Sequence, residues 1–340
     1  MSDSVPGSPS ARDRDDARSS QASQESVPNR LIRVVAHFAA AMTITGLLIR
    51  LTLQDSISGP TTVLYYATPP VMLVSGAVIC LLFSSWNRQW KQAFAWLVLL
   101  SLLVPYWIQH DWRWGKTAAR SPSQPDANAD SIDVLFWNVA RKQDLSEAAA
   151  YLRDTKPDVI GLVEVVGAAK HWREFFESEL PGYDVTVMGH GMYLLARGSS
   201  GEVQVDSLGQ NSASRKLRVT MDGREIDVFV VDIESTPWRS REQPLRELAD
   251  LASRDPDVPT IIVGDFNTPA QSGHFDPLRE QFRELFEEVG NGYGPTWPVP
   301  LPVHRLDGIW ANRLVDPVSC RHGFSSASDH RPVHATVLIE

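Results

Sequence analysis

Three long apolar runs near the start of the chain constrain its fold more than any other feature. They cover residues 34–49 (extendable to 53 past Arg50), 63–83 and 93–108. A bilayer core about 30 Å thick is spanned by ~20 helical residues, with ~17 to 25 tolerated. The middle run meets that length, the outer two are slightly short, and a snorkelling Arg50 would extend the first. We therefore expect three transmembrane helices within residues 31–110.

The alternative is a cleaved signal peptide followed by buried soluble helices. A secretory apolar region is typically ~7 to 15 residues long and lies near the N-terminus, whereas the first run begins after some thirty residues. Tryptophans also lie at the ends of the runs, where amphipathic rings favour the headgroup region: Trp86, Trp90, Trp107, Trp112 and Trp114. Pro69 and Pro70 are expected to kink the second helix.

The short loops indicate how the chain is oriented. With the N-terminus in the cytoplasm, the inner segments carry four basic residues, which are Arg30, Arg33, Arg88 and Lys91. Three spans then leave the C-terminal domain outside the cytoplasm, although Arg113, Lys116 and Arg120 argue for the reverse. We expect an integral protein of the plasma or inner membrane with an extracytoplasmic C-terminal domain.

The remaining organisation follows from composition. Residues 1–30 contain almost no large apolar side chain and are expected to be disordered, and residues 111–130, rich in Pro, Ser, Ala and Asp, are expected to be a linker. Cys80 and Cys320 fall in different parts of the chain and are not expected to pair.

Charge restricts the partners of the domain at 131–340. Residues 1–130 hold 11 Lys/Arg and 9 Asp/Glu, and the whole chain carries −9, so residues 131–340 carry −11. Such a surface disfavours sequence-independent binding of duplex nucleic acid. The basic residues that could line a nucleic-acid groove are few: Arg215, Lys216, Arg218, Arg239 and Arg241.

The C-terminal domain has mixed α and β patterns. Strand-like segments are 132–138, 159–165, 192–196, 217–221, 226–233, 260–264, 308–311 and 332–339. Helical patterns occupy 145–156, 171–180, 239–254 and 277–289.

Polar side chains follow several of these strands. Asn138 and Glu164 end two apolar runs, and Asp265 and Asn267 follow a third after Gly264, which permits a tight exit from the strand. Carboxylate and amide oxygens suit Mg²⁺ or Mn²⁺, hard cations that also bind phosphate. Alone, each group is more simply a polar strand end or a turn.

A further group lies near the C-terminus. Asp329 and His330 precede the last strand, and Asp307 lies 23 residues before His330. A carboxylate bonded to one imidazole nitrogen raises the basicity of the histidine and fixes its tautomer, which suits general-base or phosphate-stabilising work. In isolation the pair Asp329-His330 is more simply a surface feature.

In this order and on these strand ends, the motifs resemble the endonuclease/exonuclease/phosphatase (DNase I-like) superfamily. The residues that carry the resemblance are Asn138, Glu164, Asp265, Asn267, Asp307, Asp329 and His330. It covers essentially all of 131–340 and implies an α+β four-layer sandwich of two packed sheets flanked by helices. It also implies divalent-metal-dependent hydrolysis of a phosphodiester or a phosphomonoester.

The resemblance also implies roles for these residues. Glu164 resembles the principal metal ligand, with Asn138 and Asp329 nearby. Asp265 and Asn267 resemble the groups that orient the attacking water and the phosphate. His330 resembles the catalytic histidine, with Asp307 as its partner, and either Asp265 or His330 can serve as the base.

Two positions depart from the family pattern. Where the family usually has a second histidine, this chain has Asp232 or Glu234, depending on the register, and a carboxylate donates a proton at neutral pH only if its pKa is raised. Ala140 stands where some relatives carry another acidic group near the metal. The carboxylate predicts either a second metal site or low activity, and Ala140 predicts weak metal affinity.

Three functions remain open. The first is a membrane-anchored metallophosphohydrolase acting on a small phosphoester, a nucleotide or a lipid headgroup. The second keeps the chemistry but acts on extracellular nucleic acid, and the third is a catalytically impaired binding domain. Any protein partner is left open by the sequence.

Overall fold

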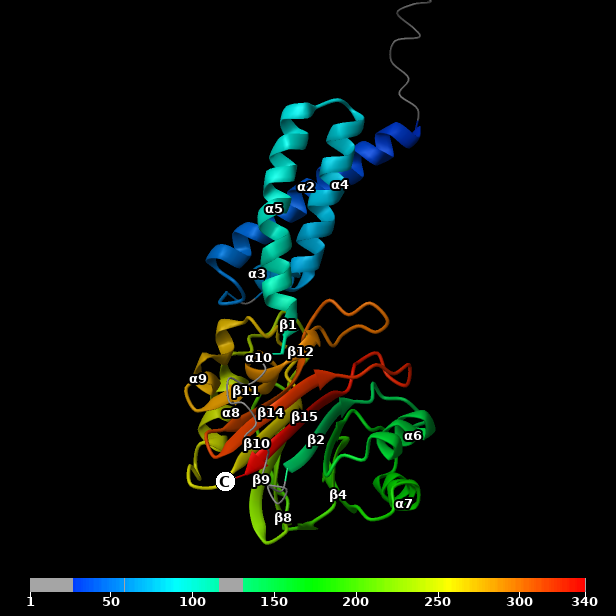
Figure 1. Cartoon of the computed structure of the whole chain (residues 1–340), viewed down its shortest axis with the longest axis vertical. Helices are drawn as coiled ribbons and strands as arrows, with labels where there is room; N and C mark the ends of the chain where they lie inside the picture. The colour runs from blue at the N-terminus through cyan, green and yellow to red at the C-terminus, as the bar shows by residue number, and fades with distance from the viewer. Residues whose placement is uncertain (1–26, 58, 116–130, 340) are drawn as a thin grey trace, which may run out of the picture.

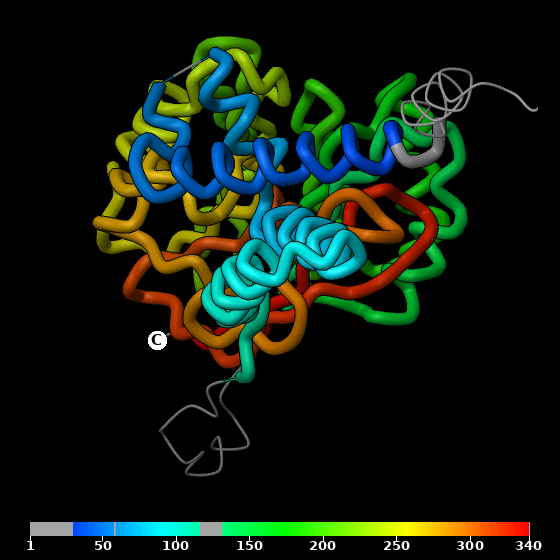
Figure 2. Tube along the Cα trace, turned by 90° about the horizontal axis from the view of Figure 1, so that it is seen from above, coloured from blue at the N-terminus to red at the C-terminus, as the bar shows by residue number. Residues whose placement is uncertain are grey.

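A computed structural model describes residues 27–57, 59–115 and 131–339 of the chain. The predicted tail at 1–30 and linker at 111–130 lie mostly outside the described residues, but the tail prediction is wrong for residues 27–30, which are helical. In the described part of the chain, four helices precede the sheets: α2 (Val27–Thr52), α3 (Pro60–Ala67), α4 (Pro70–Trp86) and α5 (Trp90–Asp111). In Figure 1, α2, α4 and α5 form an arm above the domain, and α3 lies at its base against the domain. Seen from above, α2 runs across the domain while α4 and α5 are viewed nearly end-on (Figure 2).

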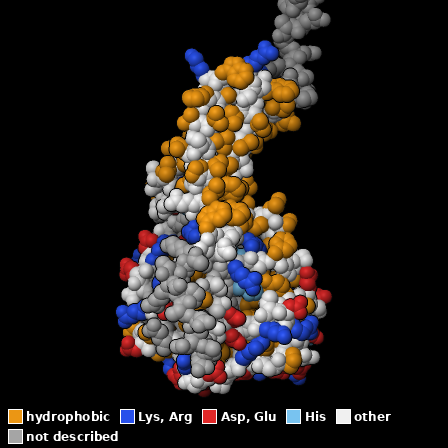
Figure 3. Space-filling view, viewed as in Figure 1, with side chains coloured by type: hydrophobic (Ala, Val, Ile, Leu, Met, Phe, Trp, Pro, Cys, Tyr) orange, Lys and Arg blue, Asp and Glu red, His pale blue; other side chains and the backbone are white. Residues whose placement is uncertain are grey.

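Two of these helices, over Arg30–Thr52 and Trp90–Asp111, are long and apolar enough to cross a membrane. The middle run is broken into α3 and α4, which meet at a bend of 72°, so the number of spans reaches three only if this pair counts as one. The break falls at Pro69 and Pro70, as expected, because proline has no N–H to continue a helix. Apolar side chains cover the arm, and charged ones gather on the domain (Figure 3).

Arg50 does not snorkel, contrary to expectation. Its side chain is buried and donates to two carbonyl oxygens near the end of α3, at Tyr65 (2.9 Å) and Thr68 (2.6 Å). The last carbonyls of a helix have no partner within it. Arg50 therefore stabilises the point at which the proline pair ends α3.

The domain contains two large sheets. The six-stranded sheet has the order β14-β15-β2-β3-β5-β4, and the other runs β11-β13-β10-β9-β8-β6, with β7 also paired to β8. The strands of the first are β2 (Ser131–Asn138), β3 (Val159–Val163), β4 (Asp184–Gly189), β5 (Met192–Ala196), β14 (Val315–His322) and β15 (Val333–Ile339). Those of the second are β6 (Ser199–Ser200), β7 (Gln204–Ser207), β8 (Ala213–Met221), β9 (Arg224–Asp232), β10 (Thr260–Asp265), β11 (Phe282–Glu284) and β13 (Asp307–Asn312).

The sheets pack face to face and are covered by helices on their outer faces. A buried cluster that includes Phe136, Leu194, Val230 and Val263 joins the two sheets. The helices α6 (Ser146–Thr155) and α7 (Ala169–Glu179) cover the first sheet, and α8 (Glu242–Ala252) and α9 (Asp276–Arg279) cover the second. This is the expected α+β four-layer sandwich. Cys80 and Cys320 are buried and unpaired, as expected.

Several segments differ from the sequence prediction, which did not include the strands β4, β6, β7 and β14. The helix expected at 277–289 is wrong, because Phe282–Glu284 forms the edge strand β11, which pairs with β13 and separates α9 from the short α10 (Leu285–Val289). Trp112–Trp114, expected at the start of the linker, forms β1 and pairs with β12 (Asn291–Tyr293). A short 3-10 turn, Gly273–Phe275, precedes α9.

Candidate active site

Four strand ends meet at one rim of the sandwich. In the second sheet β9 and β10 run parallel, so that Asp232 and Asp265 are register partners at their ends. In the first sheet β2 and β3 run parallel, with Asn138 opposite Val163 and Glu164 directly after it. Since the carboxyl ends of parallel strands lie at the same edge, residues far apart in sequence come together here.

Asp265 lies at the centre of this rim and is 1% exposed. Its Oδ2 accepts a hydrogen bond from Asn138 Nδ2 at 2.8 Å, and its Oδ1 accepts one from the backbone N–H of Asn267 at 2.9 Å. The backbone is close here, because a Cβ at Gly264 would lie 2.7 Å from the Val231 carbonyl oxygen. The glycine thus allows β10 to place Asp265 beside the neighbouring strand.

His330 and Asp307 form a buried pair. His330 Nδ1 donates to Asp307, with its two carboxylate oxygens at 2.9 and 3.1 Å. The backbone of His330 is held by the Ser328 hydroxyl at its N–H and by the Trp137 indole N–H at its carbonyl. With Nδ1 occupied, Nε2 faces Asp265 Oδ2 at 3.9 Å.

The electrostatics of these groups are strongly perturbed. Burial, with a further contribution from Asp307, raises the pKa of Asp265. Burial by itself lowers the pKa of His330, but the Asp307 and Asp265 carboxylates outweigh it and raise that pKa to about 10. The imidazole is therefore a cation at neutral pH, buried among acidic groups.

Glu164 approaches the same space from the other sheet. Its backbone has φ +61°, a conformation that few non-glycine residues adopt, and its side chain contacts Arg141 at 3.3 Å. Arg141 is mostly exposed, so this ion pair is weak and exchangeable. Strain of this kind gathers at functional sites.

The remaining predicted site residues are placed as follows. Asp329 is exposed at the cavity and accepts a hydrogen bond from the Trp297 indole N–H at 3.2 Å. Asn267, at φ +45°, donates from its amide to the Ile233 carbonyl at 2.8 Å, which fixes its side chain.

Asp232 and Glu234, the two carboxylates that could stand in place of the family's second histidine, have different surroundings. Glu234 accepts from the Thr236 hydroxyl and the Asn211 amide, and these bonds hold its pKa at about 2. Asp232 has few such bonds, and burial together with the nearby Glu164 raises its pKa to about 7. Asp232 is thus a carboxyl group that can carry a proton near neutral pH.

The donor set fits a divalent cation. Within the described residues, Asp265, Asp307 and His330 offer ligand atoms within 4.8 Å of one another, but a protonated His330 has no lone pair for a metal, so the donors to an ion are the carboxylate and amide oxygens of the rim. Burial is the main cause of the raised pKa values of Asp232 and Asp265, and repulsion from the neighbouring carboxylates of Glu164 and Asp307 adds to it. A divalent ion would relieve this repulsion and would find carboxylate and amide oxygens of the kind that Mg²⁺ prefers.

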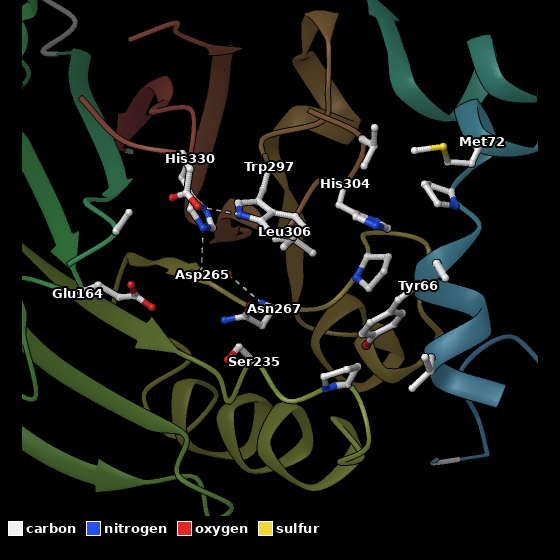
Figure 4. A pocket seen from close by; sticks show the side chains of 18 of the residues that line it. Tyr66, Met72, Glu164, Ser235, Asp265, Asn267, Trp297, His304, Leu306 and His330 are labelled. Carbon is white, nitrogen blue, oxygen red and sulfur yellow. Dashed lines mark hydrogen bonds and ion pairs between the residues drawn. The ribbon is translucent and has the colours of Figure 1, made fainter. Parts of the chain in front are cut away.

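A cavity of about 710 Å³ opens over the rim and is lined there by Glu164, Asp265, Asn267, Asp329 and His330 (Figure 4). Sequence reasoning missed part of its wall, because α3 and the start of α4 contribute Val63, Tyr66, Ala67, Pro69 and Met72. It also missed Arg141, which adjoins Glu164. No local signal in the apolar run marks these residues as lining a site.

The fold and the acidic rim around an Asp–His pair define the class of the protein. A model described as the Endonuclease/Exonuclease/phosphatase family matches residues 135–330, more than half of the chain, and the chain belongs to this family. Members of the family are metal-dependent hydrolases of phosphoesters. A sequence search of curated proteins returned no match.

Solved structures agree with this fold. D. rerio TDP2 complexed with a single strand DNA product is 17% identical, with 61% of this chain and 99% of that one covered and a TM-score of 0.51. A family protein from Bacteroides thetaiotaomicron is 16% identical, with 62% and 98% covered and a TM-score of 0.50. One from Beutenbergia cavernae is 19% identical, with 62% and 72% covered and a TM-score of 0.50. At these identities the likeness concerns the fold alone.

Proposed function

We propose that the chain is a divalent-metal-dependent phosphoesterase that hydrolyses a phosphodiester or phosphomonoester by in-line attack of water. The observation that carries the proposal is the cationic His330, held by Asp307 and facing Asp265 at the floor of a large cavity. This arrangement places a positive charge and a carboxylate together where a phosphoester can enter. Family membership supports the same chemistry.

The residues divide the reaction between them. Asp265 accepts a proton as the water oxygen bonds to phosphorus, and Asn267 orients the water and the phosphate. His330 stabilises the charge on the phosphate oxygens and gives its Nε2 proton to the ester oxygen when the P–O bond breaks. Asp307 holds His330 in the tautomer that this transfer requires.

Glu164, Asn138 and Asp329 would hold Mg²⁺ or Mn²⁺. When bound, the ion neutralises charge on the phosphate and helps to position it. The loose pairing of Glu164 with Arg141 is consistent with this role, because the carboxylate loses little when it turns to a cation.

Asp232 replaces the second histidine in this proposal, and Glu234 does not. The pKa of about 7 allows a fraction of Asp232 to be protonated and to donate a hydrogen bond to a phosphate oxygen. A neutral acid supplies less charge than an imidazolium. We therefore expect turnover to be slower than with a histidine at this position.

We further propose that the protein is tethered to a membrane by its helical arm, with the domain outside the cytoplasm. Arg30 and Arg33 at the start of α2, and Arg88 and Lys91 at the turn between α4 and α5, lie at the end of the arm away from the domain. The positive-inside rule favours the cytoplasm for that end.

A nucleic-acid substrate remains the second candidate, since D. rerio TDP2 of the same fold is complexed with a single strand DNA product. The basic residues that would bind it are engaged elsewhere. Arg215 is buried on backbone carbonyls, and Lys216 and Arg218 pair with Asp227 and Asp255. These pairings favour a smaller or more apolar phosphoester.

Hydrolysis by the purified full-length chain tests the proposal. The substrates are bis(p-nitrophenyl) phosphate, p-nitrophenyl phosphate, single-stranded DNA and phospholipid vesicles, with Mg²⁺, Mn²⁺ or a chelator. We expect metal-dependent turnover that Asp265→Asn and His330→Ala reduce at least a hundredfold, while the exposed control Asp257→Asn retains it. A folded protein that binds metal but turns over nothing in this panel would instead favour the impaired binding domain.

A further inference from the structure

The cavity has two walls of opposite character. One wall is ionic and consists of the groups around Asp265, His330 and Glu164. The facing wall is apolar and is formed by Val63, Tyr66, Ala67, Pro69 and Met72 on one side and by Val303 and Leu306 on another. Figure 4 shows Tyr66 and Met72 projecting from the helical segment towards the space over Asp265.

The charge distribution sharpens this contrast. His304 also lines the cavity, and burial lowers its pKa to about 4, so this ring is neutral at physiological pH. His304 lies near-parallel to Trp297, with ring centroids 6.2 Å apart. A small hydrophilic phosphoester would leave this whole side of the cavity in contact with water.

The apolar wall belongs to the helical arm, and it continues out of the cavity. Met72 is 49% exposed and is the first of several exposed apolar side chains along α4. Ile79, Leu82 and Trp86 follow on α4 as exposed side chains, at spacings that place them on the same helix face as Met72. Exposed apolar side chains thus extend from the cavity to the far end of α4, with one polar residue, Ser75, between Met72 and Ile79.

We propose that the cavity takes its substrate from the bilayer and that this substrate is a membrane lipid phosphoester. This inference rests on the hydrolase proposed above and names its substrate class. The phosphate lies at Asp265 and His330, the adjoining part of the lipid lies against α3, and the chain follows Met72 onto the exposed face of α4.

The position of α3 argues against the other substrate classes. The helix α3 closes one side of the cavity, next to the break at Pro69 and Pro70. Arg50 holds α3 in this position by hydrogen bonds to the carbonyl oxygens of Tyr65 and Thr68. A rigid duplex would need that side open and lined with cations. The volume of about 710 Å³ matches a headgroup with the first part of its chains.

Full-length protein reconstituted in phosphatidylcholine vesicles with Mg²⁺ tests the inference. The probes are dioleoylphosphatidic acid and dioleoylphosphatidylglycerol, compared with p-nitrophenyl phosphate and bis(p-nitrophenyl) phosphate. We expect at least one lipid to be hydrolysed. Val63→Ser should lower the ratio of lipid to soluble-ester kcat/KM about tenfold, because it replaces an apolar contact. The matched variant Val98→Ser on the exposed face of α5 should leave that ratio unchanged.

A second readout does not depend on turnover. A phosphatidic acid with a diazirine in its acyl chain should label residues 60–72 several-fold more strongly than the corresponding diacylglycerol, which has no phosphate. Residues 94–102 of α5 should be labelled equally by both probes.

The outcomes separate the two proposals. Hydrolysis of the soluble esters without lipid turnover and without phosphate-dependent labelling would overturn the lipid inference and leave the hydrolase. An unchanged ratio in Val63→Ser would also overturn it. Phosphate-dependent labelling without hydrolysis of any probe would refute the hydrolase and support a lipid site at α3.

Discussion

Arg305 offers a quantitative test of how the active-site rim is supported. Its guanidinium is buried and pairs with Glu284 at 3.3 Å and with Glu287 at 2.7 Å. Glu284 is equally buried and also accepts the Glu287 N–H at the start of α10. Arg305 lies two residues before Asp307, so this pair supports the start of β13, where Asp307 bonds to His330.

Replacing Arg305 by methionine keeps much of the side-chain volume but leaves Glu284 buried without its cation. Breaking a buried pair in this way costs about 3–5 kcal/mol. We therefore expect Arg305→Met to lower the free energy of unfolding of the domain by about 4 kcal/mol at pH 7. The double variant with Glu284→Gln should recover at least about 1.5 kcal/mol of that loss, because no buried charge then lacks its partner.

The loss should also depend on pH. Burial raises the pKa of Glu284 in the folded state, so the folded state binds the proton more readily than the unfolded state. The loss of unfolding free energy in Arg305→Met is therefore full at pH values above the pKa of Glu284 in the folded state. It shrinks as the pH falls towards the pKa of about 4.3 that this group has in the unfolded state. Urea unfolding of the full-length chain in detergent, followed by tryptophan fluorescence, measures these terms. A loss below about 1 kcal/mol, or a coupling energy within about 0.5 kcal/mol of zero, would refute the reasoning.

Three further predictions concern single residues. Burial holds the pKa of His322 well below its usual value, so stability should be full above pH ~6.5 and fall by up to about 1.4 kcal/mol per pH unit below it. His322→Phe should reduce that acid sensitivity in urea titrations at pH 7.5 and 5.5, and an unchanged slope would contradict the assignment. Gly264→Ala should cost about 1–3 kcal/mol in thermal unfolding, because its Cβ would lie 2.7 Å from the Val231 carbonyl oxygen. Asp307→Asn should lower kcat about a hundredfold with the fold intact by circular dichroism, since His330 loses its charged partner. Wild-type kcat in this variant would remove Asp307 from the mechanism.

Local sequence patterns correctly predicted features that depend only on residues adjacent in the chain. Apolar runs of strand length ending in Asn138, Glu164 or Asp265 predicted both the strand and the polar group at its end, because these depend on neighbours along the chain. The proline pair predicted the break between α3 and α4 for the same reason.

Local sequence patterns gave wrong predictions where a residue's contacts come from segments distant in the chain. Residues 277–289 have a helical pattern, yet Phe282–Glu284 is a strand because β13 offers hydrogen bonds and Arg305 offers a partner for Glu284. Arg50 was expected at the membrane surface, but the carbonyls of α3 bind it.

The sequence alone determined the family, the sandwich and the identity of the polar groups, since all of these follow from residue types and their order. Tertiary structure decided the rest. It distinguished Asp232 from Glu234 through their surroundings, and it placed α3 as a wall over Asp265. Burial, charge and the meeting of Val63 and Asp265 in one cavity, although they lie 202 residues apart in the sequence, arise only when the chain has folded, and no local pattern encodes them.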